Sequence, residues 1–309
     1  MEIKNNNPLL CDIESGICEI PESSTETVGL SVIPDQQLVK IIYFTDPICS
    51  SCWGIEPQLR KLKLEYGHSI AIEYRMGGLL PDWNYNSGGI SKPSDVAHHW
   101  DEVSEFYDMP IDGDVWLEDP LDSSYPPSIA FKAAQLQGQD IAIRFLRELR
   151  EMVFLKKINI AKWENLLSAA QTAGLNTEQF ERDYNGAGKV LFEQDLKLGL
   201  QLGVRGFPTM FFVDQEGNHE KVYGTKPYSV YEDALHKQLP GVKKAPAETD
   251  WKKLFSKYNT LTSREFAELS QTAREDSDAF LQDLADNGHI TKLISKNGPL
   301  WIIKTTVSK

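Results

Sequence analysis

Two of the four cysteines stand close together, in the sequence Cys49-Ser50-Ser51-Cys52. Thiol–disulfide exchange needs one thiolate that attacks and a second thiol near enough to resolve the mixed disulfide. A spacing of two residues in the first turn of a helix brings the two sulfurs within bonding reach, and the helix N-terminus stabilises the first thiolate. We therefore predict that Cys49 is the nucleophile and Cys52 the resolving thiol of a catalytic redox pair.

The same pair could instead bind a metal ion or be chemically inert. A structural zinc site needs four ligands in tetrahedral geometry. Cys11 and Cys18 are poorly spaced to supply a second pair of ligands, and His68 stands alone. We favour redox chemistry and expect no metal. Because the two thiols carry that chemistry themselves, no bound cofactor is expected.

Cys11 and Cys18 fall within residues 1–37, a segment rich in Asn, Ser, Glu and Pro without periodicity. This composition predicts a flexible N-terminal arm. The simplest interpretation is that both thiols are solvated. The alternatives are a second redox pair that exchanges with Cys49 and Cys52, or a weak metal clip. The spacing permits a disulfide and does not require one.

A proline precedes a later apolar run, in the sequence Phe207-Pro208-Thr209. Proline is tolerated at the first residue of a strand, so this could be simple strand entry. The alternative is a cis proline beside the cysteine pair. In that case the Phe207 backbone is free to pair with an incoming peptide. Phe207 and Pro208 are therefore candidate substrate-binding residues.

Two acidic residues flank the cysteines. A carboxylate at Asp46 would raise a nearby thiol pKa by charge repulsion, but Asp-Pro is also typical of a turn, and we favour the turn. Glu56 could accept the proton of the resolving thiol if it were buried. A surface carboxylate at Glu56 is the simpler interpretation.

The elements that must position these residues follow from the apolar pattern. Runs at 39–45 and 69–76 predict strands on either side of a helix from 49 to about 66, a βαβ unit with the cysteines at the start of its helix. A hairpin and a closing helix are predicted at 209–214, 219–224 and 228–238. Between them the pattern is helical, with residues 110–125 as the longest loop. The helices are predicted at 94–108, 126–137, 139–155, 160–173, 176–185 and 187–202.

The C-terminal part reads as a separate unit. Residues 241–250 have linker composition, and three short helices are predicted after them, at 251–258, 262–270 and 277–287. A hairpin turning at Asn297-Gly298 follows. Helices followed by such a wing often bind DNA. Residues 250–309 hold 9 basic and 8 acidic residues, too little positive charge for phosphate. We predict a winged-helix-like interaction module over 251–309 and no nucleic-acid partner.

Composition and charge indicate where in the cell the protein is expected. The 309 residues carry a formal net charge of −13, and an acidic chain is repelled by nucleic acid and anionic lipid. No run approaches the roughly 18 apolar residues of a transmembrane helix. The first residues lack the basic and apolar regions of a secretory signal. We expect a cytoplasmic protein that does not contact membranes.

The motifs together resemble the DsbA family of the thioredoxin superfamily. The resemblance rests on TDPICSSCWG at 45–54, a long helical insertion, and GVRGFPTMFF at 203–212. It implies an α/β thioredoxin fold over 38–240 with a helical insertion at about 94–190. It further implies that Pro208 is cis and faces the cysteine pair. The 2-hydroxychromene-2-carboxylate isomerases share this fold, but the intact CSSC argues against their chemistry.

Two blocks and the C-terminal extension are similar to a narrower group, the YjbH (SpxH) proteins. The blocks are FTDPICSSCWGIEPQLRKLKLEYG and GDVWLEDPLDSSYPPSIAFKAAQLQG. Those proteins are cytoplasmic DsbA-like adaptors that bind the transcription factor Spx and promote its degradation by ClpXP. Two functions are therefore open. The first, which we favour, is a thiol–disulfide oxidoreductase acting on protein or small thiols. The second is an adaptor for a Spx-like client and ClpXP, with redox-gated binding.

Overall fold

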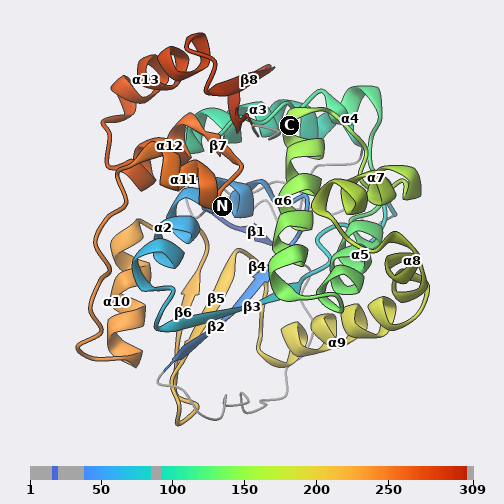
Figure 1. The fold of residues 1–309 in the computed structure, drawn as a ribbon. Coiled ribbons are helices and arrows are strands. Elements are labelled where there is room, and N and C mark those ends of the chain that lie inside the picture. Colours follow the sequence, from blue (N-terminus) through green and yellow to red (C-terminus); the bar gives the residue numbers. More distant parts are fainter. Residues whose placement is uncertain (1–15, 20–37, 85–91, 305–309) are drawn as a thin grey trace, which may run out of the picture.

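The computed structural model describes residues 16–19, 38–84 and 92–304. Its centre is a four-stranded sheet in the order β3-β2-β5-β6 (Figure 1). The strands are β2 (Val39–Thr45), β3 (Ile70–Met76), β5 (Thr209–Val213) and β6 (His219–Tyr223). β2 is parallel to β3 and antiparallel to β5, and β6 is antiparallel to β5. This arrangement confirms the predicted thioredoxin fold.

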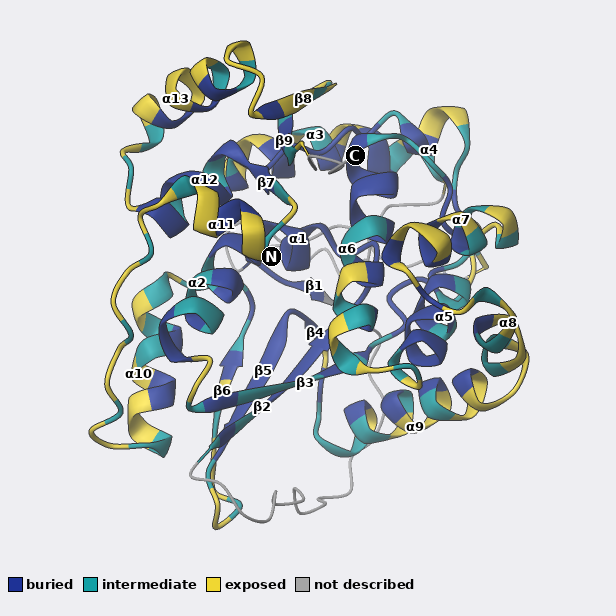
Figure 2. Ribbon diagram, viewed as in Figure 1, coloured by how far each residue is buried: buried dark blue, intermediate teal, exposed yellow. Residues whose placement is uncertain are grey.

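The two central strands are buried on both faces, because helices cover the sheet from each side. All five residues of β5 are buried, as are six of the seven in β2 (Figure 2). Both strands are accordingly continuous apolar runs, the pattern expected when neither face meets water. β2 carries the chain directly into the cysteine pair, so the core of the sheet fixes where that pair lies.

The helix that begins at the cysteines is divided in two. A single helix from 49 to about 66 was expected, but the structure contains α1 (Ser50–Gly54) and α2 (Glu56–Tyr66). Pro57 stands in the first turn of α2 and has no N–H to continue the hydrogen-bond ladder of α1. Ile55 is the junction, with φ −92° and ψ 1°. Because of this break, α1 is a short separate helix, with Cys49 as its N-cap residue and Cys52 within it.

The helical insertion has the predicted helices and one more. Its helices are α3 (Ser94–Tyr107), α4 (Val115–Glu118), α5 (Tyr125–Gln135), α6 (Gln139–Leu155), α7 (Trp163–Ala173), α8 (Thr177–Asn185) and α9 (Ala187–Gln201). The short α4 lies where the longest loop was expected. Figure 1 shows α5 to α9 gathered beside the sheet, in green to yellow. The amphipathic α6 is buried along one face and carries charged residues to the cysteine pair.

The chain continues through α10 (Tyr228–Gln238) and residues 241–250, which contain no helix or strand. The C-terminal unit then contains α11 (Trp251–Lys257), β7 (Thr260–Thr262), α12 (Ser263–Ser270), α13 (Arg274–Asp286), β8 (Ile290–Ser295) and β9 (Gly298–Ile303). The three predicted helices and the hairpin are present. The strands form a sheet in the order β7-β9-β8, around a separate core that includes the buried Trp301. The three-residue β7 had no sequence signal.

The predicted N-terminal arm contains one short segment that is held in place by a strand of the thioredoxin domain. Within residues 1–37, the structure describes 16–19, and there the chain is ordered rather than free. β1 (Cys18–Glu19) pairs antiparallel with β4 (Gly206–Phe207). Composition reports only local preferences, whereas this strand is held by a partner almost two hundred residues away. Cys11 lies outside the described residues.

Candidate functional site

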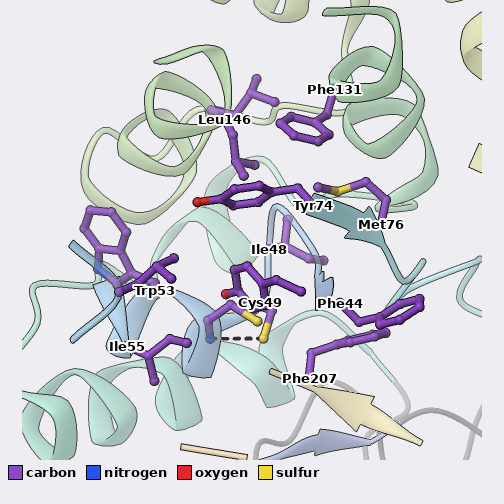
Figure 3. Close-up of a cluster of buried hydrophobic side chains, with 14 of the residues drawn as sticks. Phe44, Ile48, Cys49, Trp53, Ile55, Tyr74, Met76, Phe131, Leu146 and Phe207 are labelled. Carbon is purple, nitrogen blue, oxygen red and sulfur yellow. Dashed lines mark hydrogen bonds between the residues drawn. The ribbon is translucent and has the colours of Figure 1, made fainter. Parts of the chain in front are cut away.

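Cys49 and Cys52 lie at the start of α1, both with 0% of their surface exposed. Figure 3 shows Cys49 within a cluster of buried hydrophobic side chains. Cys49 is the N-cap residue of α1, with extended backbone angles. Its Sγ accepts a hydrogen bond from the backbone N–H of Cys52 at 3.1 Å. Sulfur thereby takes the place that a Ser or Asp oxygen has in an ordinary N-cap. Both thiols are free, so the structure holds the reduced form of the pair.

The two thiols differ in their electrostatic surroundings. Burial raises the pKa of the Cys49 thiol, and the nearby Cys52 and Asp46 raise it further. Burial acts in the same direction on Cys52, but a hydrogen bond from Cys49 and the charge of Arg150 hold the pKa of Cys52 below its ordinary value. In this closed arrangement a negative charge is therefore better accommodated on Cys52 than on Cys49.

Arg150 is the cation beneath the pair. It projects from α6 with only 1% of its surface exposed. Its guanidinium donates to the Glu56 carboxylate and, at 2.7 Å, to Thr45 Oγ1. The expectation of a surface carboxylate at Glu56 was wrong, because this acid is 9% exposed and neutralises a buried arginine. No local pattern on α6 distinguishes Arg150 from a solvated arginine.

Asp46 is also buried, and it has both of the roles considered for it. Its Oδ1 accepts from the backbone N–H of Ile48 at 3.1 Å, which forms the predicted turn. Its Oδ2 accepts from Leu79 N at 2.8 Å and Ser124 Oγ at 2.9 Å. Burial raises the pKa of Asp46 to about 6. Its charge in turn raises the pKa of Cys49, so Asp46 is a turn residue that also acts on the thiol.

The strand that carries Phe207 and Pro208 lies across from the cysteines. The peptide bond between these residues is cis. Phe207 is fully buried, and its ring fills the space beside Gly77, where a Cβ atom would come within 1.7 Å of the ring. Figure 3 shows Phe207 at the edge of the buried cluster that contains Cys49. The backbone of Phe207 faces β1 rather than solvent.

Cys18 completes this arrangement. In β1 it lies opposite Phe207, and its Sγ is 3.4 Å from the Sγ of Cys49. Cys18 is disulfide-bonded and has 0% of its surface exposed. The interpretation of Cys18 as a solvated thiol was therefore wrong. The structure thus brings Cys18, Cys49, Cys52 and the Phe207-Pro208 strand together in one place.

Sequence reasoning missed a tyrosine that links the two sides of the site. Tyr107 donates to Ser51 Oγ at 3.1 Å and shares a hydrogen bond of 3.0 Å with Thr225 Oγ1. Ser51 lies between the two cysteines, and Thr225 lies next to β1. Tyr107 stands at the end of α3, and nothing in its local sequence marks it as part of a site.

Among the residues that the structure describes, no group of three or more His, Cys, Asp or Glu side chains is placed to hold a metal ion. Within the same residues, no helix combines the length and apolar character needed to cross a bilayer.

Comparisons with known proteins agree with this geometry. A family model described as Thioredoxin matches residues 43–233. The chain is 36% identical over 306 residues to the ClpXP adapter protein SpxH of Halalkalibacterium halodurans, covering 96% of this chain and 98% of that protein. It is 32% identical over 276 residues to the ClpXP adapter protein SpxH of Bacillus subtilis, covering 87% and 91%.

A solved structure gives the same fold. The cytosolic disulfide reductase DsbM from Pseudomonas aeruginosa superimposes with a TM-score of 0.51, covering 64% of this chain and 99% of that one. Because the two sequences are only 21% identical, the match concerns the fold alone. It covers about the length of the thioredoxin domain with its helical insertion.

Proposed function

The chain belongs to the SpxH family of ClpXP adapter proteins, and we propose that it binds a client protein and presents it to a ClpXP-type protease. The observation that carries this proposal is the extent of the similarity. The alignment with the first relative covers 98% of that protein, so it includes the C-terminal unit as well as the thioredoxin domain. The proposed client is a Spx-like protein.

The state of the cysteine pair favours binding over rapid turnover. Cys49 has no exposed surface and lies against the chain's own β1 strand, so an external disulfide has no direct path to it. Reactive cysteines ordinarily sit in partly exposed, electropositive surroundings that lower their pKa. Here burial raises the pKa of Cys49 instead.

The C-terminal unit offers apolar surface for a partner. Ile294 on β8 is 80% exposed and Phe280 on α13 is 40% exposed. Among the large hydrophobic side chains that the structure describes, Ile294 has the largest exposed fraction, and burial of such a side chain in a partner's pocket would contribute binding energy. We assign client or protease contact to this unit, as an interaction module and not a DNA reader.

The test is reconstituted degradation. A Spx-like client is incubated with ClpXP, with and without the purified protein, and loss of client is followed on gels. The protein should accelerate degradation, and a Cys49→Ser/Cys52→Ser variant should keep that effect. Ile294→Asp should reduce it, whereas Leu117→Asp, at a site 58% exposed on α4, should not. If the client were degraded at the same rate with and without the protein, the proposal would be wrong.

A second candidate is thiol–disulfide oxidoreductase activity, favoured by the surroundings of the two thiols. The pair has the elements that redox chemistry needs, since Cys49 caps a helix and the Arg150 charge lowers the pKa of Cys52. Reduction of insulin disulfides by dithiothreitol, with and without the protein, tests this. Acceleration that disappears in Cys49→Ser would support the enzyme, and a rate equal to the uncatalysed one would exclude it.

A further inference from the structure

The β1 strand lies where a peptide would have to lie to react with Cys49. Its backbone pairs antiparallel with the two residues that precede Pro208, with Cys18 opposite Phe207 and Glu19 opposite Gly206. Strand addition of this kind gives affinity through main-chain hydrogen bonds, and adjacent pockets select the side chains. Here the side chain presented to the cysteine pair is itself a cysteine.

Close backbone contacts fix the strand at both ends. The Gly16 carbonyl accepts hydrogen bonds from Thr225 N at 3.0 Å and from Thr225 Oγ1 at 3.2 Å. Gly16 has a φ of +67°, and a Cβ atom there would come within 2.5 Å of Thr225 Cβ. At the other end of the strand, Gly206 lies opposite Glu19, and a Cβ on Gly206 would come within 2.5 Å of the Cys18 carbonyl oxygen. Both glycines are therefore required for the strand to approach.

The sulfurs are placed for exchange. The 3.4 Å between the Sγ atoms of Cys49 and Cys18 is longer than the roughly 2.05 Å of a disulfide bond, so they are in contact but not bonded. It falls within the roughly 3–3.5 Å that separates reacting atoms before bond formation. Cys18 is in a disulfide and Cys49 is a free thiol, so a nucleophile and a disulfide already face each other.

We propose that the Gly16–Glu19 strand is an internal substrate of the cysteine pair, and that Cys49 exchanges with the disulfide held by Cys18. In the first step the Cys49 sulfur bonds to the Cys18 sulfur. The bond from Cys18 to its former partner breaks, and that partner leaves as a thiol carrying the Cys49 proton.

The second step resolves this mixed disulfide. The Cys52 sulfur attacks Cys49, the bond between Cys49 and Cys18 breaks, and Cys18 leaves as a thiol with the Cys52 proton. Two electrons have passed from the CSSC pair to the disulfide that Cys18 held, with no other reactant. The same steps in reverse return the electrons. The N-terminal segment and the CSSC pair thus share one disulfide between them.

This proposal does not depend on the adapter function, because it concerns one chain alone. It also identifies the class of ligand that would pair with β4, an extended peptide with cysteine opposite Phe207. An external peptide must compete with a tethered strand. A tethered partner has an effective concentration on the order of mM, so at about 10 µM protein it is favoured roughly 100-fold over a second copy.

Trapping the intermediate tests the proposal. In Cys52→Ser the second step cannot occur, so the bond between Cys49 and Cys18 should accumulate after mild oxidation. It is detected by peptide mapping under non-reducing conditions, on a mixture of ¹⁴N- and ¹⁵N-labelled protein. The expected cross-linked peptides are uniformly labelled, as an intramolecular bond requires. Cross-linked peptides of mixed label, or Cys49 bound only to added glutathione, would overturn the proposal.

A second pair of variants keeps all four cysteines in place. Gly16→Ala should displace the strand, because its Cβ would clash with Thr225. Gly174→Ala is the matched control, since Gly174 also has a positive φ, +84°, but an added Cβ meets nothing within 4 Å. In the reduced proteins, alkylation of Cys49 should be faster in Gly16→Ala than in Gly174→Ala or the wild type. Equal rates in all three would show that the strand does not cover Cys49 and would refute the internal substrate.

Discussion

The guanidinium of Arg147 donates two hydrogen bonds to the carboxylate of Glu265, at 2.8 and 3.0 Å. Arg147 belongs to α6 in the helical insertion, and Glu265 to α12 in the C-terminal unit. The same guanidinium lies 4.4 Å from the centre of the Trp53 ring, which directly follows Cys52. Burial favours the neutral form of Glu265, yet the charges of Arg147 and Arg60 hold its pKa below the ordinary value. Arg147 therefore links Glu265 of the C-terminal unit to Trp53, which lies on the helix that bears the cysteines.

Glu265→Gln should strongly destabilise the protein. The side chain is completely buried, and its loss leaves Arg147 and Arg60 without their shared counter-charge. Breaking a buried pair by removing one partner costs about 3–5 kcal/mol. We expect a decrease of that order in the free energy of unfolding, measured by urea denaturation followed by circular dichroism. Glu118→Gln is the control, because Glu118 pairs with Lys157 at the surface. A loss no larger than that of the control would contradict this prediction.

Asp46 should make stability depend on pH between about 4 and 7. Its pKa is about 6 in the folded chain, against 3.8 for an ordinary aspartate, so the folded protein binds its proton more readily. The stability it contributes is fully present below about pH 3.8 and is lost as pH rises through 6. A shift of this size corresponds to about 3 kcal/mol.

The measurement compares the wild type with Asp46→Asn, which cannot titrate. Urea denaturation at about pH 4 and about pH 7.5 gives the unfolding free energy of each protein. Relative to the variant, the wild type should lose about 2.4 kcal/mol between the two pH values, since at about pH 4 the unfolded chain is already partly ionised. The variant's own loss of hydrogen bonds is nearly the same at both, so it cancels in the difference. Parallel pH curves for the two proteins would show that Asp46 does not titrate in this range.

Much of the framework could be predicted from the sequence, because its signals are local. The strand at Val39–Thr45 has the predicted bounds, and the helix at Gln139–Leu155 agrees at both ends. The spacing of apolar residues predicts which face of a helix or strand is buried, even when the element that packs against it is not known. The CSSC spacing likewise places both cysteines in one helical turn, which the structure confirms through the bond from Cys52 N to Cys49 Sγ.

What could not be predicted depends on partners far away in the sequence. Arg150, Glu56 and Tyr107 look like surface residues until the fold places them beside the cysteines. The ordering of Cys18 depends on the edge offered by Gly206 and Phe207, which no local composition encodes. Interactions of this kind are set by tertiary context, and at residues 16–19 that context outweighs the local composition.

Arg150 should set the acidity of Cys52. Its charge lowers the pKa of Cys52, so removing it should raise that pKa. Arg150→Met alone would leave Glu56 buried and unpaired, so the test uses Arg150→Met/Glu56→Gln. The pH dependence of Cys52 alkylation is measured in two proteins, Cys49→Ser and Cys49→Ser/Arg150→Met/Glu56→Gln. The midpoint should move to higher pH in the variant that lacks Arg150. An unchanged midpoint would mean that the arginine acts only as a structural partner of Glu56.

Gly77→Ala should displace Phe207, the residue that precedes the cis proline. An added Cβ would lie 1.7 Å from the tip of the Phe207 ring, closer than any side chain can tolerate. Overpacking of this kind costs about 1–3 kcal/mol, and here it would push Phe207 toward β1. We expect a lower free energy of unfolding. We also expect faster alkylation of Cys49 in the reduced protein, because β1, which lies against Cys49, is displaced.

A rescue separates this steric effect from any other consequence of losing Gly77. Replacing the ring in Gly77→Ala/Phe207→Leu removes the atoms that would clash, so part of the lost stability should return. Phe207→Leu alone should instead be destabilising, because the smaller side chain leaves a cavity next to Gly77. The two substitutions should therefore be non-additive, with the double variant more stable than the sum of the single effects predicts. Additive free energies would show that Gly77 and Phe207 do not share this space.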